Sequence, residues 1–270
     1  PMVMEGFDEI EDPAVRLAIC EALVNAAESL ADDRKADLSW LTPLDATLAD
    51  PYYRMNEFEA QALEDKDWEY RGSFSLTAED VAADELNLVF EGIDTYGDVY
   101  LNDIYLGSTE NMFHAHRFDV TETSRQGENA LRVVLHSAIT TIRTLAENSP
   151  LDLISSTERA RPYIRKAQYA YGWDWGPRLV QIGLWRPVHL EIVRRARVVS
   201  PYAYTRSLEG GVARVHVEAE VDGYGDADLA AEVRIALDGV TAASARVPVT
   251  NVRGVLGLDA ALDVAEPRLW

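Results

Sequence analysis

The sequence contains little of several features that define common protein classes. Cys20 is the one cysteine in 270 residues, which excludes an internal disulfide and any metal site built from several cysteines. Basic residues are outnumbered, with 25 lysines and arginines against 46 acidic residues, and the net charge of −21 argues against nucleic acids and anionic membranes as partners. We find no long uncharged apolar run and no N-terminal basic segment followed by an apolar one. Neither a transmembrane helix nor a secretory signal is therefore expected, which favours a cytoplasmic location.

The apolar residues make up 47% of the chain, enough for a sizeable core, and the first of them follow a helical period. In residues 12–31, Asp12 can cap a helix whose first position is Pro13, and the apolar residues that follow fall on one stripe. Cys20 lies beside this stripe and is interpreted as a small hydrophobic residue. The pattern predicts an N-terminal helix.

From Trp68 onward the apolar period changes to two. Alternation or short apolar runs occur in residues 68–76, 86–90, 99–101, 131–135 and 188–192, with glycines between several of them. Alternation of this kind is typical of half-buried strands with one wet face. We therefore predict an all-β fold in which residues 1–196 form a jelly-roll β-sandwich that also carries the N-terminal helix.

A second domain is predicted from residue 197 to residue 270. Three further alternating stretches follow Ser200-Pro201, with turns expected at Gly210-Gly211, Asp222-Gly223 and Asp238-Gly239. This pattern is similar to the start of an immunoglobulin-like sandwich, which needs about 100 residues. We expect this domain to be truncated in the chain and a longer protein to continue beyond it.

Residues 171–177, with the sequence Tyr-Gly-Trp-Asp-Trp-Gly-Pro, are the most informative stretch. Trp173 and Trp175 flank Asp174, and the glycines on either side allow the backbone to turn sharply or to approach a ligand. Indole faces stack on the apolar faces of sugar rings, and a carboxylate accepts hydrogen bonds from sugar hydroxyls. The stretch favours a loop that faces a carbohydrate, whereas two tryptophans buried in the core would be the ordinary alternative. The long polar connection at 137–165 leads into it and favours a functional role.

The same stretch belongs to an ordered set of motifs that resembles the N-terminal region of β-mannosidases in glycoside hydrolase family 2. The longest match runs from Arg165 to Pro177 and is followed by Gly183-Leu184-Trp185-Arg186-Pro187-Val188. The earlier matches, in the order of the family, are Asp50-Pro51-Tyr52-Tyr53, Asn56-Glu57, Asp67-Trp68-Glu69-Tyr70, Phe90-Glu91-Gly92-Ile93-Asp94-Thr95-Tyr96, Val99-Tyr100-Leu101-Asn102, Leu106-Gly107, Asn111-Met112-Phe113 and Phe118-Asp119-Val120-Thr121. The similarity is strong over residues 49–193 and loose over residues 197–270.

The resemblance implies a galactose-binding-like jelly roll, then an immunoglobulin-like sandwich, then a (β/α)8 barrel that carries catalysis. It implies retaining hydrolysis of terminal β-D-mannose from non-reducing ends by two barrel glutamates, held about 5–5.5 Å apart in retaining enzymes. No residue of this chain is assigned to either catalytic role, so the chain alone should be inactive. The implied partners are a β-mannoside or oligosaccharide substrate and the C-terminal barrel of the same protein.

In the family, the loop that corresponds to residues 171–177, called here the Trp-Asp loop, reaches into the substrate pocket of the barrel. The resemblance therefore implies that Trp173 forms part of the wall around the terminal sugar and that Asp174 accepts hydrogen bonds from its hydroxyls. The residues expected to support the loop are Arg165, Lys166, Gln168, Tyr169 and Trp175, with Trp175 and Trp185 interpreted as structural. We interpret Asp94 as a turn former and His189 as a surface residue of a strand.

Two regions depart from the family pattern. Family members usually open with a strand, whereas residues 1–48 contain the helical pattern described above. The family usually has Asn-Gly in a hairpin where this chain has Asn102-Asp103, and aspartate tolerates positive φ less readily than glycine does. We expect that turn to be less favourable than the usual one.

No cofactor and no metal site are predicted. His114 and His116 alternate along the chain, but this pair lacks the third ligand that a zinc site needs. Two other carbohydrate-related functions stay open: a stand-alone carbohydrate-binding module, and a related family 2 exo-glycosidase of different sugar specificity. A sandwich that binds other proteins is compatible with the acidic composition, although no motif supports it.

Overall fold

The computed structural model describes residues 34–37, 52–155, 158–174, 176–223, 229–252 and 255–267. These residues fall into two compact units, the first from Arg34 to Ile192 and the second from Val193 onward. Most of the elements are β-strands, which confirms the predicted all-β class. The predicted helix at 12–31 lies outside the described residues, and the domain limits 1–196 and 197–270 stay predictions.

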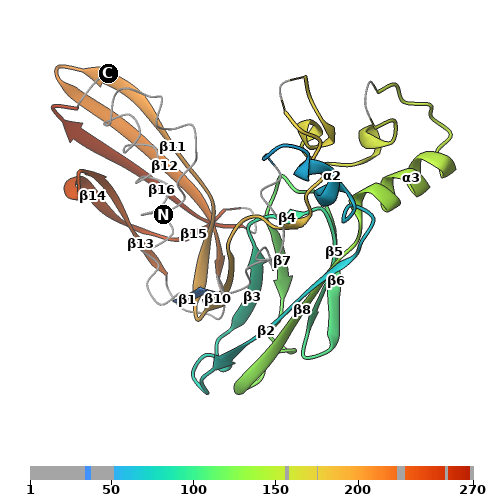
Figure 1. Ribbon diagram of the computed structural model, residues 1–270. Helices are drawn as coiled ribbons and strands as arrows, with labels where there is room; N and C mark the ends of the chain where they lie inside the picture. The colour runs from blue at the N-terminus through green and yellow to red at the C-terminus, as the bar shows by residue number, and fades with distance from the viewer. Residues whose placement is uncertain are drawn as a thin grey trace. The chain divides into compact units, whose positions relative to one another are not determined.

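The first unit contains two four-stranded sheets, drawn mainly in cyan and green in Figure 1. The strand order of one sheet is β1 (Arg34–Asp37), β10 (Val188–Val193), β3 (Glu85–Phe90) and β7 (His116–Asp119). The strand order of the other is β2 (Trp68–Leu76), β8 (Gly127–Leu135), β5 (Tyr96–Leu101) and β6 (Ile104–Glu110), with antiparallel pairing throughout. A short antiparallel pair, β4 (Ile93–Asp94) and β9 (Gly183–Leu184), completes the unit.

The core of the first unit is built from the apolar residues of these strands. On β8, Leu131, Val133 and Leu135 are buried and alternate with more exposed residues, as the period of two predicts. They belong to one cluster with buried residues of β3, β5 and β10, and the rings of Phe90 and Phe118 meet edge to face at 6.0 Å. The alternation in the sequence therefore identified the core-facing positions of this sandwich.

The hairpin between β5 and β6 turns at Asn102 and Asp103. Their φ angles are 52° and 67°, the positive values that a two-residue turn of this kind requires. The Asn102 side chain stabilises the turn, because its amide donates to the carbonyl of Thr123 at 2.9 Å and its oxygen accepts from the Ala130 amide at 3.0 Å. Hydrogen bonds thus hold the Asn102 side chain in place. Asp103 also adopts positive φ, although its Cβ makes this conformation less favourable than it is for glycine.

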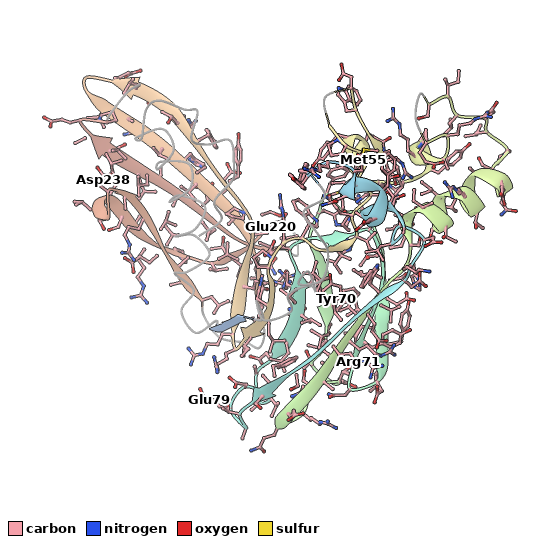
Figure 2. All side chains as sticks on the ribbon, in the orientation of Figure 1. Met55, Tyr70, Arg71, Glu79, Glu220 and Asp238 are labelled. Atoms are coloured by element: carbon pink, nitrogen blue, oxygen red, sulfur yellow. The ribbon has the colours of Figure 1, made fainter. Side chains whose placement is uncertain are left out.

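Helices and loops gather at one end of the first unit. There α2 (Asn56–Gln61), α3 (Ala138–Asn148) and the 3₁₀ turns η2 (Arg161–Tyr163) and η3 (Gln168–Tyr171) lie close together, with Met55 labelled at the start of α2 (Figures 1 and 2). The Ser137 hydroxyl caps α3 by accepting from the Thr140 amide at 3.1 Å, and Ile139 and Ile142 are buried. The stretch at 137–165, described from the sequence as a long polar connection, therefore contains a helix. None of the helices in the described ranges is long and apolar enough to cross a membrane.

The second unit is a smaller sandwich. One sheet has the order β11 (Ala196–Glu209), β12 (Val212–Gly223), β16 (Val255–Ala265) and β15 (Thr250–Val252), and the other pairs β13 (Ala230–Leu237) with β14 (Val240–Pro248). Apolar residues of β12, β13 and β16 form its core, as expected for an immunoglobulin-like sandwich. The predicted turns at Gly210-Gly211 and Asp238-Gly239 are confirmed, and Figure 2 labels Asp238 at the second.

The turn predicted at Asp222-Gly223 is wrong. Both residues belong to the end of β12 and pair with Arg197 and Ala196 of β11. The Arg197 guanidinium lies 2.5 Å from the Asp222 carboxylate, so cross-strand pairing extends a strand through a dipeptide that commonly forms turns.

Candidate functional site

An open groove of about 1430 Å³ lies at the helical end of the first unit. Most of its lining comes from two stretches far apart in the sequence, one around α2 and one that contains the predicted sugar-facing loop, and Arg143 and Glu158 complete it. The lining residues are Tyr52, Arg54, Glu57, Phe58, Gln61, Arg143, Glu158, Tyr171, Gly172, Trp173, Asp174, Gly176, Pro177 and Arg178. The groove therefore combines aromatic surface with charged side chains of both signs.

The Trp-Asp loop leaves η3 through Gly172, whose φ of 96° lies in the region that favours glycine. The Gly172 amide donates to the Tyr169 carbonyl at 3.0 Å, and the Gly176 amide closes the following turn on the Trp173 carbonyl at 3.4 Å. The Trp173 side chain is 53% exposed and Asp174 is also exposed. The loop thus presents one indole and one carboxylate to the groove, while Trp175 lies outside the described residues.

Glu64 anchors the segment that follows the loop. Its carboxylate accepts a hydrogen bond from the Arg178 guanidinium at 2.5 Å and from the Val180 amide at 3.4 Å. Gln61, at the end of α2, donates its amide to the Arg178 carbonyl at 3.1 Å. These contacts bind the two walls of the groove to each other across more than a hundred residues of sequence, and no local motif indicates them.

Glu158 is engaged by two arginines of the groove. Arg143 donates to its carboxylate at 2.9 Å, and the Arg178 guanidinium lies 3.9 Å from the same oxygen. The Glu158 side chain is 14% exposed, so these ion pairs are partly shielded from water. The charges of Glu158, Arg143 and Arg178 therefore hold this part of the groove together, and Asp174 is an exposed residue of the same lining.

Lys166 is buried inside the fold, in the segment that precedes the Trp-Asp loop. Its ammonium contacts the Asp94 carboxylate and donates to the Gln181 carbonyl at 2.6 Å, and the two charged side chains are 1% and 7% exposed. Burial lowers the pKa of Lys166, and the charge of Asp94 opposes that shift. Asp94 lies in β4 and also accepts from the Thr95 hydroxyl, so its interpretation as a turn former is wrong. A carboxylate this deeply buried requires a cation, and Lys166 supplies it.

The other predicted supports contact the loop's neighbourhood in different ways. Arg165 forms an exposed ion pair with Glu110 at 2.7 Å. Gln168 donates its side-chain amide to the carbonyl of Arg161 at 3.1 Å, which ties η3 to η2. Tyr169 is 63% exposed and contributes its carbonyl to the turn at Gly172. Arg165, Gln168 and Tyr169 therefore lie on the surface, in contrast to Lys166.

Tyr171 is fully buried at the base of the groove. Its hydroxyl has no hydrogen-bond partner within the described part of the chain. Burial, followed by the charge of Asp94, raises the pKa of this phenol well above its usual range, so the hydroxyl stays neutral. A buried unpaired hydroxyl costs stability, and Tyr171 directly precedes the Trp-Asp loop in the sequence.

Two further residues bear on the earlier interpretations. His189 is only 8% exposed and lies between Glu91 and Glu191, at 3.7 and 3.4 Å, so its interpretation as a surface residue is wrong. The reason is that β10 is an inner strand of its sheet, between β1 and β3. Trp185 packs on Gly92, where a Cβ would lie 2.5 Å from the indole nitrogen, and its N–H donates to the Met112 carbonyl at 3.2 Å.

Comparison with known proteins assigns the family. The model described as glycosyl hydrolase 2 galactose-binding domain-like matches residues 43–186, just over half of the chain. The chain therefore belongs to this family, and the resemblance inferred from the motifs is confirmed.

The chain is also similar to two fungal relatives. It is 34% identical over 232 residues to β-mannosidase B of Aspergillus oryzae and 34% identical over 230 residues to β-mannosidase B of Aspergillus terreus. Each alignment covers 83% of this chain and 26% of the relative, so the chain spans about a quarter of their length.

Solved structures agree with this assignment. A β-D-mannosidase from Dictyoglomus thermophilum superposes with a TM-score of 0.76 at 31% identity, covering 90% of this chain and 31% of that one. A β-glucuronidase from glycoside hydrolase family 2 superposes with a TM-score of 0.53 at 20% identity, over 76% of this chain and 21% of that one. The second likeness concerns the fold alone.

Proposed function

We propose that this chain is the N-terminal, non-catalytic region of a β-mannosidase that hydrolyses terminal β-D-mannose residues from non-reducing ends. Its contribution is the Trp-Asp loop, which completes a substrate pocket on a catalytic barrel of the same protein. The observation that carries the proposal is the exposure of Trp173 and Asp174 on a loop whose base is fixed by buried contacts. Preorganised groups of this kind bind a ligand without paying to order themselves.

The chemistry of the two side chains suits a sugar ring. The exposed indole of Trp173 offers a flat apolar face, and the Asp174 carboxylate offers acceptors for neighbouring hydroxyls. The charged groups Arg143, Glu158 and Arg178 bind one another, whereas the exposed indole and Asp174 can meet a ligand, as can Arg54 and Glu57 in the same groove. The indole and the carboxylate support recognition of a polyhydroxylated substrate.

The relatives support the remaining parts of the proposal. Those named β-mannosidase are about three to four times as long as the aligned segment, which leaves room for a barrel that carries both catalytic glutamates. On this account Trp173 and Asp174 bind substrate, and Arg165, Lys166, Gln168, Tyr169 and Trp175 support the loop. The isolated chain is expected to be inactive.

Hydrolysis assays on the full-length protein test the reaction and the sugar. We expect turnover of an aryl β-mannoside with kcat/KM well above that for the matching β-galactoside, β-glucuronide and N-acetyl-β-glucosaminide. A preference for one of the other three glycosides would contradict the mannosidase assignment and support the related family 2 exo-glycosidase.

Calorimetric titration of the 270-residue chain separates a shared pocket from an independent binding module. If Asp174 needs the barrel to form a complete pocket, mannose and mannobiose should give no saturable heat with this chain alone. Saturable binding that is lost in Trp173→Ala would instead favour a stand-alone carbohydrate-binding module.

A further inference from the structure

Three potential metal ligands meet on one face of the second unit. His216 and Glu218 lie two residues apart on β12, so their side chains point to the same face of the sheet. Asp259 lies on β16 directly opposite Glu218 in the antiparallel register. A ligand atom from each side chain lies within 4.8 Å of the others. The cluster therefore depends on the pairing of two strands of the second unit.

We propose that His216, Glu218 and Asp259 bind one zinc ion or a closely related divalent transition-metal ion. The Nε2 atom of His216 lies 3.3 Å from Oε1 of Glu218 and 3.2 Å from Oδ2 of Asp259. Zinc bonds of about 2.0–2.2 Å in a tetrahedron place neighbouring ligand atoms about 3.3–3.5 Å apart. The two separations from the His216 nitrogen are close to that range.

The ligand types select the class of ion. One imidazole with two carboxylates suits zinc and neighbouring transition metals, whereas calcium takes six to eight oxygen ligands and magnesium an octahedral oxygen shell. Two carboxylates also neutralise the double charge of the ion. With three protein ligands, one tetrahedral position stays available for water or a group from another molecule.

Tyr204 on the neighbouring strand β11 contacts two of the proposed ligands, Glu218 and His216. The Tyr204 hydroxyl on β11 donates to Oε1 of Glu218 at 3.4 Å, and the Tyr204 ring lies 5.2 Å from the His216 ring. Hydrogen bonds to ligand carboxylates and packing against a ligand imidazole restrict their orientations, as in known metal sites. The His216 side chain is 12% exposed and is therefore held more firmly than an ordinary surface histidine.

A second carboxylate on the same face of the sheet, that of Asp263, can be compared with that of Asp259. Asp263, four residues after Asp259 on β16, receives two hydrogen bonds from Arg214, at 2.8 and 3.1 Å. That carboxylate is neutralised by a fixed guanidinium, whereas Glu218 and Asp259 both contact an imidazole that can exchange a proton for a metal ion. This site was not predicted from the sequence, where only His114 and His116 were considered, because it needs the register of β12 and β16.

Calorimetric titration of the 270-residue chain with Zn²⁺ in a non-chelating buffer tests the proposal. We expect one saturable site, with binding weakened at least about tenfold in Asp259→Asn and in His216→Gln. The matched controls Asp263→Asn and His114→Gln should bind Zn²⁺ as the unmodified chain does. Mg²⁺ should give no saturable heat in any of these proteins.

A second test of the same site uses Co²⁺, because a tetrahedrally coordinated Co²⁺ ion has an intense visible absorption band. That band should appear with the unmodified chain, be displaced by Zn²⁺ and be absent in Asp259→Asn, whose side chain is 73% exposed and can change without disturbing the fold. The proposal is overturned if the unmodified chain shows no saturable Zn²⁺ binding. Equal affinity in Asp259→Asn and Asp263→Asn would overturn it as well.

Discussion

The ammonium group of Lys166 and the carboxylate of Asp94 form an ion pair that is almost completely shielded from water, with side chains 1% and 7% exposed. The pair joins β4 to the segment that enters the Trp-Asp loop, and the Gln181 carbonyl accepts a further hydrogen bond from the same ammonium. Contacts on both sides of the loop therefore converge on one buried cation. Residues 166 and 181, which lie before and after the exposed residues 173 and 174, are thereby joined to each other.

Replacing Lys166 by methionine should strongly destabilise the first unit. Removing one partner of a buried ion pair leaves an uncompensated charge, and the cost is about 3–5 kcal/mol. The neighbouring variant Arg165→Met breaks an exposed pair with Glu110 and should cost less than about 1 kcal/mol. Urea unfolding of both variants measures the difference, and similar losses would show that the buried pair has no special role.

Removing the Tyr171 hydroxyl should stabilise the chain. The hydroxyl is buried and has no partner within the described residues, so Tyr171→Phe removes a desolvation penalty of about 1–3 kcal/mol. The free energy of unfolding from urea titration should rise by about 1 kcal/mol or more. A clear loss of stability would mean that the hydroxyl is hydrogen-bonded in the folded chain.

The stability contributed by His136 should decrease as the pH rises. The hydrogen bond to Asp98 raises the pKa of His136 above 6.5, with a further contribution from Asp67. A raised pKa in the folded state means that the stabilisation is fully present below the unfolded pKa and is lost as the pH passes the folded value. The stability difference between the unmodified chain and His136→Gln should therefore shrink from about pH 5.5 to about pH 8.5. An NMR titration should also give His136 a lower midpoint in Asp98→Asn, and an unchanged midpoint would contradict this account.

Asp103→Gly should stabilise the β5–β6 hairpin. Asp103 adopts a φ of 67°, which glycine adopts without steric cost, and the gain is reduced by the greater freedom of glycine in the unfolded chain. We expect a net increase on the order of 0.5 kcal/mol in the free energy of unfolding. Asn102→Gly should instead lose about 1–3 kcal/mol, because its side chain bonds to Thr123 and Ala130. Equal effects of the two substitutions would contradict this explanation.

Sequence periodicity predicted the strands well, because a half-buried strand must alternate. Leu131, Val133 and Leu135 are buried for that reason. The N-cap at Ser137 and the spacing of Ile139 and Ile142 likewise set α3 locally. These elements depend on neighbours along the chain, which is the information that one sequence contains.

The groove and its supports depend on distant partners and were less predictable. The residue types at Trp173 and Asp174 indicated carbohydrate chemistry, but the contact between Glu64 and Arg178 joins positions 114 residues apart. Asp94 was misinterpreted because an aspartate after glycine and isoleucine is compatible with a turn, and only the fold brings Lys166 to it. The cluster of His216, Glu218 and Asp259 was missed because it depends on the register of β12 and β16.

The most direct test of the central claim is the kcat/KM of the full-length protein carrying Asp174→Asn, measured on an aryl β-mannoside. If Asp174 binds a sugar hydroxyl, loss of its charge should weaken the interaction by about 1–3 kcal/mol and lower kcat/KM by roughly 5- to 150-fold. The exposed Asp152→Asn serves as the matched control and should leave kcat/KM unchanged. An Asp174→Asn enzyme that unfolds like the parent and retains its full kcat/KM would contradict the account.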